Sequence, residues 1–331
     1  MMAAPSDLPS PLAVPEVAEP RRLLLASALL LATFLSATLS GALQAVEAPR
    51  LAGLGEQLRW ALGHAAIGLP YAVALLSILV AHEAGHALAA RAHRVPASLP
   101  YFLPLPLSAV GTLGAVIGLR GEVRSRNALV DIAAAGPLAG LCVAVPVLVL
   151  GIHLSAVGPT HPGDLIEGQS LLYLGLKYLV KGELLPSGGR DLQLHPVAFA
   201  GWVGLLVTVI NLIPIGPLDG GHLAAAAGGA GHDRRSRLVH RALPVVGLVV
   251  ALAVGLSSRA PGSRAVALGV QAGLPWVFWS VALLGLRRFS GGRWPEPLGQ
   301  EPLTAGRKFT LALVAVLFVL LFMPWVMREA A

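Results

Sequence analysis

Long apolar runs separated by short arginine-rich stretches dominate the hydropathy pattern of this chain. Such runs predict membrane-crossing helices, because a helix needs about 20 apolar residues to span the hydrocarbon core of a bilayer. The expected spans are residues 23–42, 61–90, 127–152, 196–215, 243–256, 265–286 and 309–326. The pattern therefore predicts an all-α polytopic membrane protein with about seven transmembrane helices.

The helical pattern breaks between the second and third spans. Prolines at positions 96, 100, 104 and 106 cannot lie inside a regular helix, and residues 110–117 are apolar, β-branched and punctuated by glycine. This composition is typical of extended structure, and the stretch is too short to span. Irregular backbone at membrane depth persists only where protein or a cavity surrounds it. We therefore expect residues 97–120 to form a membrane-embedded hairpin or loop.

The chain divides into four parts by composition. Residues 1–20 contain five prolines and are expected to form a flexible tail, followed by the first span and a polar loop over 21–60. Residues 61–225 form the expected core, which includes a mixed loop at 153–195 with a short amphipathic piece at 171–180. Residues 226–331 are expected to hold a basic loop and the C-terminal spans.

Composition and charge fit a membrane location. The chain is 55% hydrophobic and 12% charged, whereas a soluble domain is usually about a quarter charged. The net charge of +7 does not require a nucleic-acid partner, because an arginine excess on cytoplasmic loops gives the same total, and we expect no such partner. With the N-terminus inside, 16 Lys and Arg residues lie on the cytoplasmic side and eight on the other. We expect that orientation, in a bacterial cytoplasmic membrane. The single cysteine, Cys142, excludes an internal disulfide and a cysteine-based zinc site.

An ionisable motif, His82-Glu83-Ala84-Gly85-His86, lies near the end of the second span. On a helix His82 and His86 are one turn apart and share a face, so they can bind zinc while Glu83 accepts a proton from water. The alternative is a chance match. Ionisable groups inside a span are costly, and no Arg or Lys lies in the same turn to form a salt bridge, so a metal site is favoured.

Two histidines leave zinc without the third protein ligand that catalytic sites use. The third ligand could come from the same helix or from elsewhere, but the residues after His86 do not continue the extended zinc-binding pattern. Asp219 is the best remote candidate. It follows the fourth span, which breaks at Pro214 and Pro217, and a glycine-flanked turn can aim a carboxylate inward. The alternative reading of Asp-Gly-Gly is an ordinary turn.

The two motifs together resemble the site-2 protease family of intramembrane zinc metalloproteases. That family pairs H-E-x-x-H with N-x-x-P-x-x-x-x-D-G, and residues 82–86 and 211–220 match both patterns in this order. Residues 111–115 and 131–140 resemble especially the chloroplast members of the family and their bacterial relatives. The resemblance covers about residues 60–225, so the expected core is an intramembrane metalloprotease core.

The resemblance implies a role for the matching polar residues. His82, His86 and Asp219 would bind one zinc ion per chain, and Glu83 would be the general base. Asn211 would lie beside the active site and orient substrate or stabilise the oxyanion.

The resemblance also implies roles for glycines and a proline. The hairpin, with Gly111 and Gly114, would guide an unwound substrate segment by strand pairing. Gly136, Pro137 and Gly140 would allow close helix packing, which small residues favour in membranes independently of the resemblance.

The implied function is hydrolysis of a peptide bond within or near the transmembrane segment of a single-span membrane protein, after a first cleavage by another protease. The alternatives are a transporter or metal conduit that uses the intramembrane His and Asp residues, and a non-catalytic relative. Transporters often contain internal repeats, and the sequence shows none. His222 follows the Asp-Gly-Gly where an arginine is more usual, and a plain surface role is favoured over a role near the metal.

Overall fold

The computed structural model describes residues 19–45, 53–106, 108–118, 123, 125–228, 231–258, 260–289, 299 and 301–330. Within them the helices are α1 (Glu19–Leu43), α2 (Leu54–Gly63), α3 (Ala65–Ala92), α4 (Arg126–Leu154), α5 (Leu171–Lys181), α6 (Pro196–Asn211), α7 (Asp219–Gly228), α8 (His232–Ser257), α9 (Gly262–Phe289) and α10 (Ala305–Leu321). The strands are β1 (Tyr101–Pro104), β2 (Thr112–Val116), β3 (Ala156–Pro159), β4 (Leu165–Glu167), β5 (Arg190–Gln193) and β6 (Met327–Glu329).

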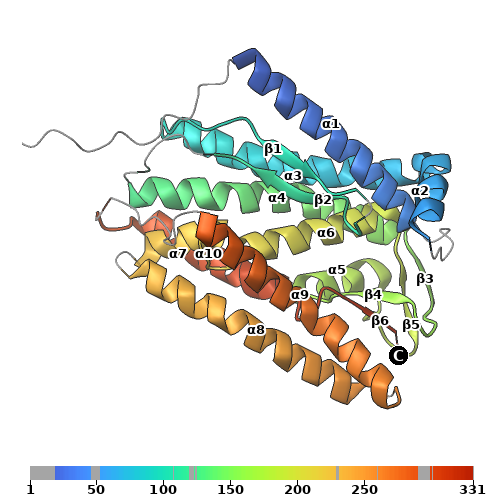
Figure 1. Ribbon diagram of the computed structural model, residues 1–331. Helices are drawn as coiled ribbons and strands as arrows, with labels where there is room; N and C mark the ends of the chain where they lie inside the picture. Colours follow the sequence, from blue (N-terminus) through green and yellow to red (C-terminus); the bar gives the residue numbers. More distant parts are fainter. Residues whose placement is uncertain are drawn as a thin grey trace, which may run out of the picture.

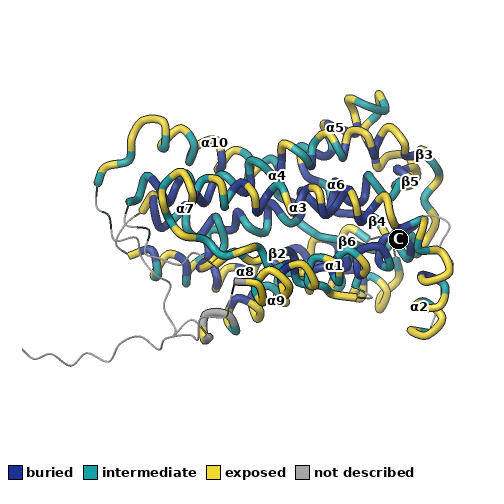
Figure 2. Tube along the Cα trace, turned by 90° about the horizontal axis from the view of Figure 1, so that it is seen from above, coloured by how far each residue is buried: buried dark blue, intermediate teal, exposed yellow. Residues whose placement is uncertain are grey.

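The long helices lie side by side, and α5 with the strands β3 to β6 is gathered at one end of the bundle (Figure 1). Helices α3, α4 and α6 contribute most of the buried residues, whereas α8 and α9 expose much of their length (Figure 2). Tyr71, Phe199 and Trp202 stack in succession at the contact of α3 with α6, with ring centroids 5.4 and 5.6 Å apart. The core therefore centres on the helix that carries the H-E-x-x-H motif.

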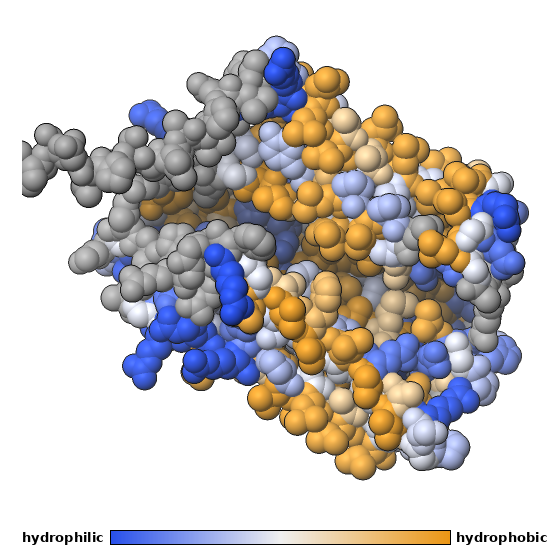
Figure 3. Space-filling model, in the orientation of Figure 1, coloured by the Kyte–Doolittle hydropathy of each residue, from blue (hydrophilic) through white to orange (hydrophobic). Residues whose placement is uncertain are grey.

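Five helices in the described residues are long and apolar enough to cross a membrane, namely α1, α3, α4, α8 and α9. Apolar side chains cover the middle of the face shown in Figure 3, and hydrophilic side chains gather toward its two ends. Many leucine and valine side chains on these helices are exposed, which a water-soluble protein would not tolerate on this scale. The chain is a multi-pass, largely helical membrane protein.

The sequence prediction of seven spanning helices differs from the structure at two places. Helix α6 has 16 residues and α10 has 17, so neither reaches the usual spanning length. Helix α6 ends at Asn211 because Pro214 cannot continue it, and α10 ends ahead of Pro324. Within the described residues five helices, rather than seven, have the length and composition of a span.

Two predicted loops contain helix instead. The polar loop expected before residue 61 contains most of α2. The span expected over 61–90 begins with the last residues of α2, and His64 separates these from α3, which carries the motif. The expected basic loop after residue 226 is mostly the first turns of α8, which begins at His232. Arg59 lies on the exposed side of α2, and Arg234 and Arg235 are exposed in the first turns of α8, so these charges are compatible with helical structure. The predicted tail over residues 1–18 lies outside the described residues.

The predicted hairpin is present between α3 and α4. Strands β1 and β2 pair antiparallel, with Tyr101 opposite Val116 and Phe102 opposite Ala115. The hairpin packs on α1, where the hydroxyl of Ser36 donates a hydrogen bond of 2.6 Å to the carbonyl of Gly111. Gly111 has φ +83°, a backbone conformation that favours glycine.

The predicted mixed loop at 153–195 is a small folded unit, in which the predicted amphipathic piece at 171–180 is the helix α5. Strand β3 pairs with β5, β4 pairs with β6 near the C-terminal end, and α5 packs beside them. The fully buried Lys177 of α5 forms ion pairs of 2.9 Å with both Glu167 and Asp191. Periodicity did not reveal these strands, because each has only three or four residues.

Candidate metal centre

The helix α3 places His82 and His86 on one face and holds both side chains inside the protein. Their side chains are 5% and 13% exposed. The helix forms here because residues 65–92 are rich in alanine and leucine, and Pro70 lies in its second turn, far from the motif. Glycine at position 85 lets α4 approach, since a side-chain carbon there would overlap the carbonyl of Ala135.

A hydrogen bond to α4 fixes the orientation of His86. Its Nδ1 lies 2.7 Å from the carbonyl oxygen of Ile132. A carbonyl only accepts, so Nδ1 carries the proton and Nε2 presents a lone pair on the opposite side of the ring. This arrangement, in which the outer nitrogen of a histidine bonds a carbonyl, is the usual support for a metal-binding histidine.

Two glycines of α4 make room for the imidazole rings. A side-chain carbon at Gly136 would overlap Nε2 of His86, and one at Gly140 would lie 3.3 Å from Nδ1 of His82. Pro137 is buried between them inside α4. The stretch predicted to allow close helix packing therefore lies directly behind the two histidines.

The carboxylate of Asp219 reaches the same place from α7, of which it is the first residue. The sequence led us to expect a turn here, but a helix starts at Asp219, and a carboxylate is favoured at a helix N-terminus by the helix dipole. The two following glycines are needed by the backbone, because a side-chain carbon at Gly220 would overlap the carbonyl of Leu212, and one at Gly221 that of Gly216. The Asp-Gly-Gly sequence thus packs the helix start against the 212–218 loop.

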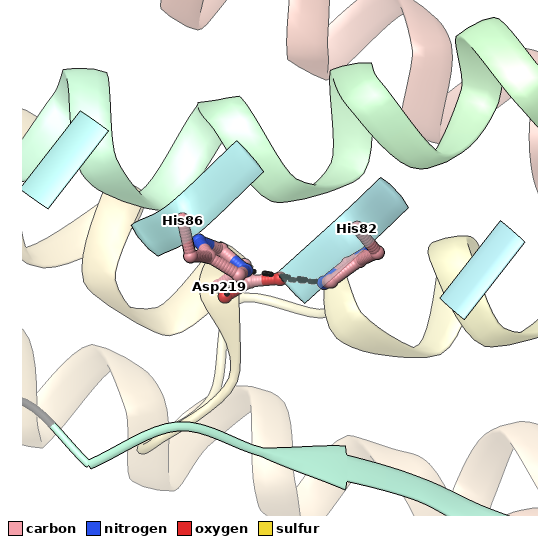
Figure 4. A group of neighbouring side chains, drawn as sticks. All are labelled: His82, His86 and Asp219. Carbon is pink, nitrogen blue, oxygen red and sulfur yellow. Dashed lines mark hydrogen bonds and ion pairs between the residues drawn. The ribbon is translucent and has the colours of Figure 1, made fainter. Parts of the chain in front are cut away.

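The three side chains converge on one point, as Figure 4 shows. The Nε2 atoms of His82 and His86 are 3.1 Å apart, and each lies 3.2 Å from a different carboxylate oxygen of Asp219. Oδ2 of Asp219 is buried and accepts no hydrogen bond from any described residue, despite the nearby imidazole. Two imidazole nitrogens and the carboxylate oxygens, all on largely buried side chains, thus face one another, and a cation among them would satisfy all of these atoms.

The spacing of these donor atoms fits zinc. Zinc binds histidine nitrogen and carboxylate oxygen at about 2.0–2.1 Å in tetrahedral sites, so neighbouring ligand atoms lie about 3.3 Å apart. The observed separations of 3.1 and 3.2 Å match this edge length. Two nitrogens and one carboxylate oxygen also leave one tetrahedral position open, as catalytic zinc sites require.

Glu83 lies beside the cluster on α3 and is 7% exposed. Its carboxylate forms no hydrogen bond or ion pair with the part of the chain that the structure describes. An unpaired carboxylate this deeply buried destabilises a fold, so its presence in a membrane span points to chemistry.

The other predicted residues lie on α6, on the hairpin and on α7. Asn211 is the last residue of α6, eight positions before Asp219. Gly111 bonds to α1, and Gly114 lies in β2 with open space beside its α-carbon. His222 is half-buried on the first turn of α7, which differs from the surface position expected for it.

Three further groups support the site and escaped the sequence analysis. The carbonyl of Ile132 holds His86, Ser236 accepts a 3.1 Å hydrogen bond from the amide of Gly216, and Arg126 bonds the end of α7. Every residue has a carbonyl, so no signal marks Ile132. The sequence analysis treated Arg126 only as one of the cytoplasmic positive charges, although its position at the start of a predicted span could have marked it as a residue that contacts a neighbouring helix.

The comparison with known families settles the relationship. The sequence model of peptidase family M50 matches residues 70–254, which is more than half of the 331 residues and includes all three converging side chains. This chain belongs to peptidase family M50. The family predicted from the two motifs is confirmed.

Several plant proteins are similar to this chain. The probable zinc metalloprotease EGY1, chloroplastic, of Arabidopsis thaliana is 32% identical over 264 residues, which cover 77% of this chain and 43% of that protein. The probable zinc metalloprotease EGY2, chloroplastic, of Oryza sativa subsp. indica is 35% identical over 187 residues, 55% of this chain and 33% of that protein. This M50 chain therefore spans less than half the length of these curated relatives.

Proposed function

We propose that the protein is a zinc-dependent intramembrane endopeptidase. The observation that carries this proposal is the convergence of His82, His86 and Asp219 at separations of 3.1 and 3.2 Å beside a buried, unpaired Glu83. The two histidines and Glu83 lie on the membrane-spanning helix α3, and Asp219 lies on α7, which packs against the membrane-spanning helix α4, so the bond to be cut lies within or near the bilayer.

In the proposed reaction the ion and Glu83 have separate roles. The two histidines and Asp219 would hold the zinc ion, which would polarise a peptide carbonyl and lower the pKa of water. The Glu83 carboxylate accepts a proton from the attacking water and delivers it to the amine nitrogen that leaves. The hydrogen bond from His86 to Ile132 holds the imidazole that would face the ion, so little reorganisation is needed.

The substrate in this proposal is a single-span membrane protein, cut after a first cleavage by another protease, as in regulated intramembrane proteolysis. A helical substrate must unwind to expose a carbonyl, and the β1–β2 hairpin offers free strand edges to which an unwound segment can pair. Asn211 at the end of α6 would orient that segment or stabilise the oxyanion.

The proposed setting is a bacterial cytoplasmic membrane with the N-terminus inside. His86 and His82 are six and ten residues from the end of α3, or about 9 and 15 Å at 1.5 Å per residue. Water would reach the site over this short distance from the end where Arg91 and Arg94 lie, which the arginine count assigns to the cytoplasm.

Zinc content and cleavage, measured together in purified protein, test the proposal. We expect wild type to hold one zinc, Asp219→Ala to lose it, and Glu83→Gln to keep it while cleavage of a transmembrane substrate falls by about 10²- to 10⁴-fold. His222→Ala is the matched control on α7, because its ring is not among the converging donor atoms, and it should keep zinc.

The proposal is overturned if wild type binds no zinc or if Glu83→Gln cleaves at the wild-type rate. Retained ion flux across liposomes by Glu83→Gln, with no cleavage by wild type, would instead support the metal-conduit alternative. Loss of zinc from His222→Ala would change the ligand set.

A further inference from the structure

The C-terminal end of α7 is held by an arginine of α4. Nε of Arg126 donates a 2.7 Å hydrogen bond to the carbonyl of Ala226, and Nη2 donates one of 3.1 Å to the carbonyl of Ala227. The last four carbonyls of a helix have no partner within the helix, so these two are available to a donor from outside. A guanidinium binds both at once and also complements the negative end of the helix dipole.

This contact restrains the position of Asp219, because α7 is one short helix of ten residues and moves as a unit. Ala226 is seven residues from Asp219, or about 10 Å along the helix. On α4, Arg126 is ten residues from Gly136, or about 15 Å. The two helices run in opposite directions, with Asp219 level with the histidines and Ala226 level with Arg126. Holding the far end of α7 therefore limits how far the near end can tilt or slide.

Helix α4 is then the common support of all three proposed ligands. Its Ile132 carbonyl holds His86, its Gly136 and Gly140 receive the two rings, and its Arg126 holds the helix that carries Asp219. We propose that Arg126 is a positioning residue, which keeps the Asp219 carboxylate in register with the two histidines through α7. This inference rests on the proposed zinc-binding function.

The competing explanation is that Arg126 only fastens the segment before α10. Its Nη1 lies 3.4 Å from the backbone carbonyl of Glu301, whose side chain accepts hydrogen bonds from Ser125 Oγ at 2.8 Å and the Asn127 amide at 3.4 Å. Glu301→Ala removes the side-chain bonds at the same corner of the molecule but leaves both bonds from Arg126 to α7. It is therefore a matched control.

The experiment measures zinc affinity by competition with a chromogenic chelator, on the 331-residue chain in detergent. Loss of a group that supports a metal ligand usually weakens binding by 10- to 100-fold, and we expect this for Arg126→Gln. The zinc affinity of Arg126→Lys should lie between those of Arg126→Gln and wild type, because an ammonium group keeps the charge but lacks the planar guanidinium that bonds two carbonyls at once. Glu301→Ala should bind zinc as wild type does.

The absorption spectrum of the Co²⁺-substituted protein supplies a second readout that general destabilisation would not move in the same way. We expect the visible absorption bands of bound Co²⁺ to differ from wild type in Arg126→Gln and to match wild type in Glu301→Ala. Wild-type affinity and spectrum in Arg126→Gln would overturn the inference, as would an equal loss in Glu301→Ala. Failure of wild type to bind zinc would instead overturn the proposed function.

Discussion

The imidazole ring of His86 lies directly against the backbone of Gly136, with no space for a side-chain carbon between them. Gly140, one turn further along α4, faces His82 with slightly more room, since an added carbon there would lie 3.3 Å from the ring nitrogen Nδ1. The two glycines therefore set how close α4 can approach the proposed ligands.

Gly136→Ala should abolish zinc binding, because the added methyl group must displace the ring of His86 from the convergence point. Gly140→Ala should weaken zinc binding less, since His82 needs to move by only a few tenths of an ångström. The measurement is zinc stoichiometry and affinity in purified protein of equal monodispersity.

The matched control is Gly175→Ala, an exposed glycine within α5 that has no neighbouring atom near its added carbon. This substitution should leave zinc binding unchanged and stabilise α5 by about 0.5–1 kcal/mol, as expected for alanine in place of glycine in a helix. Equal zinc affinity in all three variants would show that the glycines of α4 do not determine the position of the histidines.

The sequence predicted the parts of this site that depend on local pattern. Apolar runs with arginine ends located α1, α3, α4, α8 and α9, and the spacing of His82 and His86 placed both on one helical face. Pairing the first motif with Asp-Gly-Gly identified Asp219, although the sequence did not show that a helix begins there. These features follow from periodicity and from short motifs.

The remaining features depend on contacts between residues far apart in the chain. Arg126 meets Ala226 across 100 positions, and β4 pairs with β6 across more than 150. No hydropathy pattern indicates which charge bonds which helix end, and strands of three residues are too short for alternation to be visible. The supporting contacts of the site therefore required the structure.

The hairpin offers a matched pair of glycine substitutions. Gly111 and Gly114 have φ of +83° and +95°, so alanine at either costs about 1–2 kcal/mol of backbone strain. A side-chain carbon at Gly111 would also lie 2.6 Å from the α-carbon of Ala37 on α1, whereas Gly114 faces open space. Gly111→Ala should therefore lower the free energy of unfolding by about 1–3 kcal/mol more than Gly114→Ala does.

Thermal unfolding in detergent measures this difference, and cleavage by Gly114→Ala then tests the role of the hairpin. If β2 pairs with substrate, Gly114→Ala should reduce cleavage beyond its small loss of stability. Equal unfolding temperatures for the two variants would show that the contact with Ala37 does not hold the hairpin on α1.

The buried ion cluster of the 153–195 unit should be sensitive to loss of its only lysine. Lys177 is completely buried and bonds Glu167 and Asp191, so Lys177→Met leaves two carboxylates buried without their cation. Breaking a buried ion pair in this way costs about 3–5 kcal/mol. Lys308→Met, at an exposed position of α10, is the control and should change stability little.

A combined variant separates charge from packing in this cluster. Lys177→Met together with Glu167→Gln and Asp191→Asn removes all three charges, and it should recover much of the stability lost by Lys177→Met alone. If the combined variant is as unstable as the single one, the lysine contributes through its volume rather than its charge.

Stability should also depend on pH through Asp191. Burial raises the pKa of the Asp191 carboxyl above its ordinary value, and the negative charge of Glu167 raises it further, while Lys177 opposes both effects. In the unfolded chain this carboxyl releases its proton near pH 3.9, but the folded protein retains the proton to higher pH. The folded state therefore binds more protons in that interval, and the free energy of unfolding should fall as pH rises from about 4 through the raised pKa.

Asp191→Asn should remove this slope, because the amide does not titrate. Urea unfolding of the detergent-solubilised protein at a series of pH values measures it, with Glu183→Gln at the exposed ion pair with Arg190 as the control. An unchanged slope in Asp191→Asn would assign the pH dependence to another carboxyl. A slope lost in Asp191→Asn but kept in Glu183→Gln would show that deprotonation of the buried Asp191 carboxyl beside Glu167 destabilises the fold.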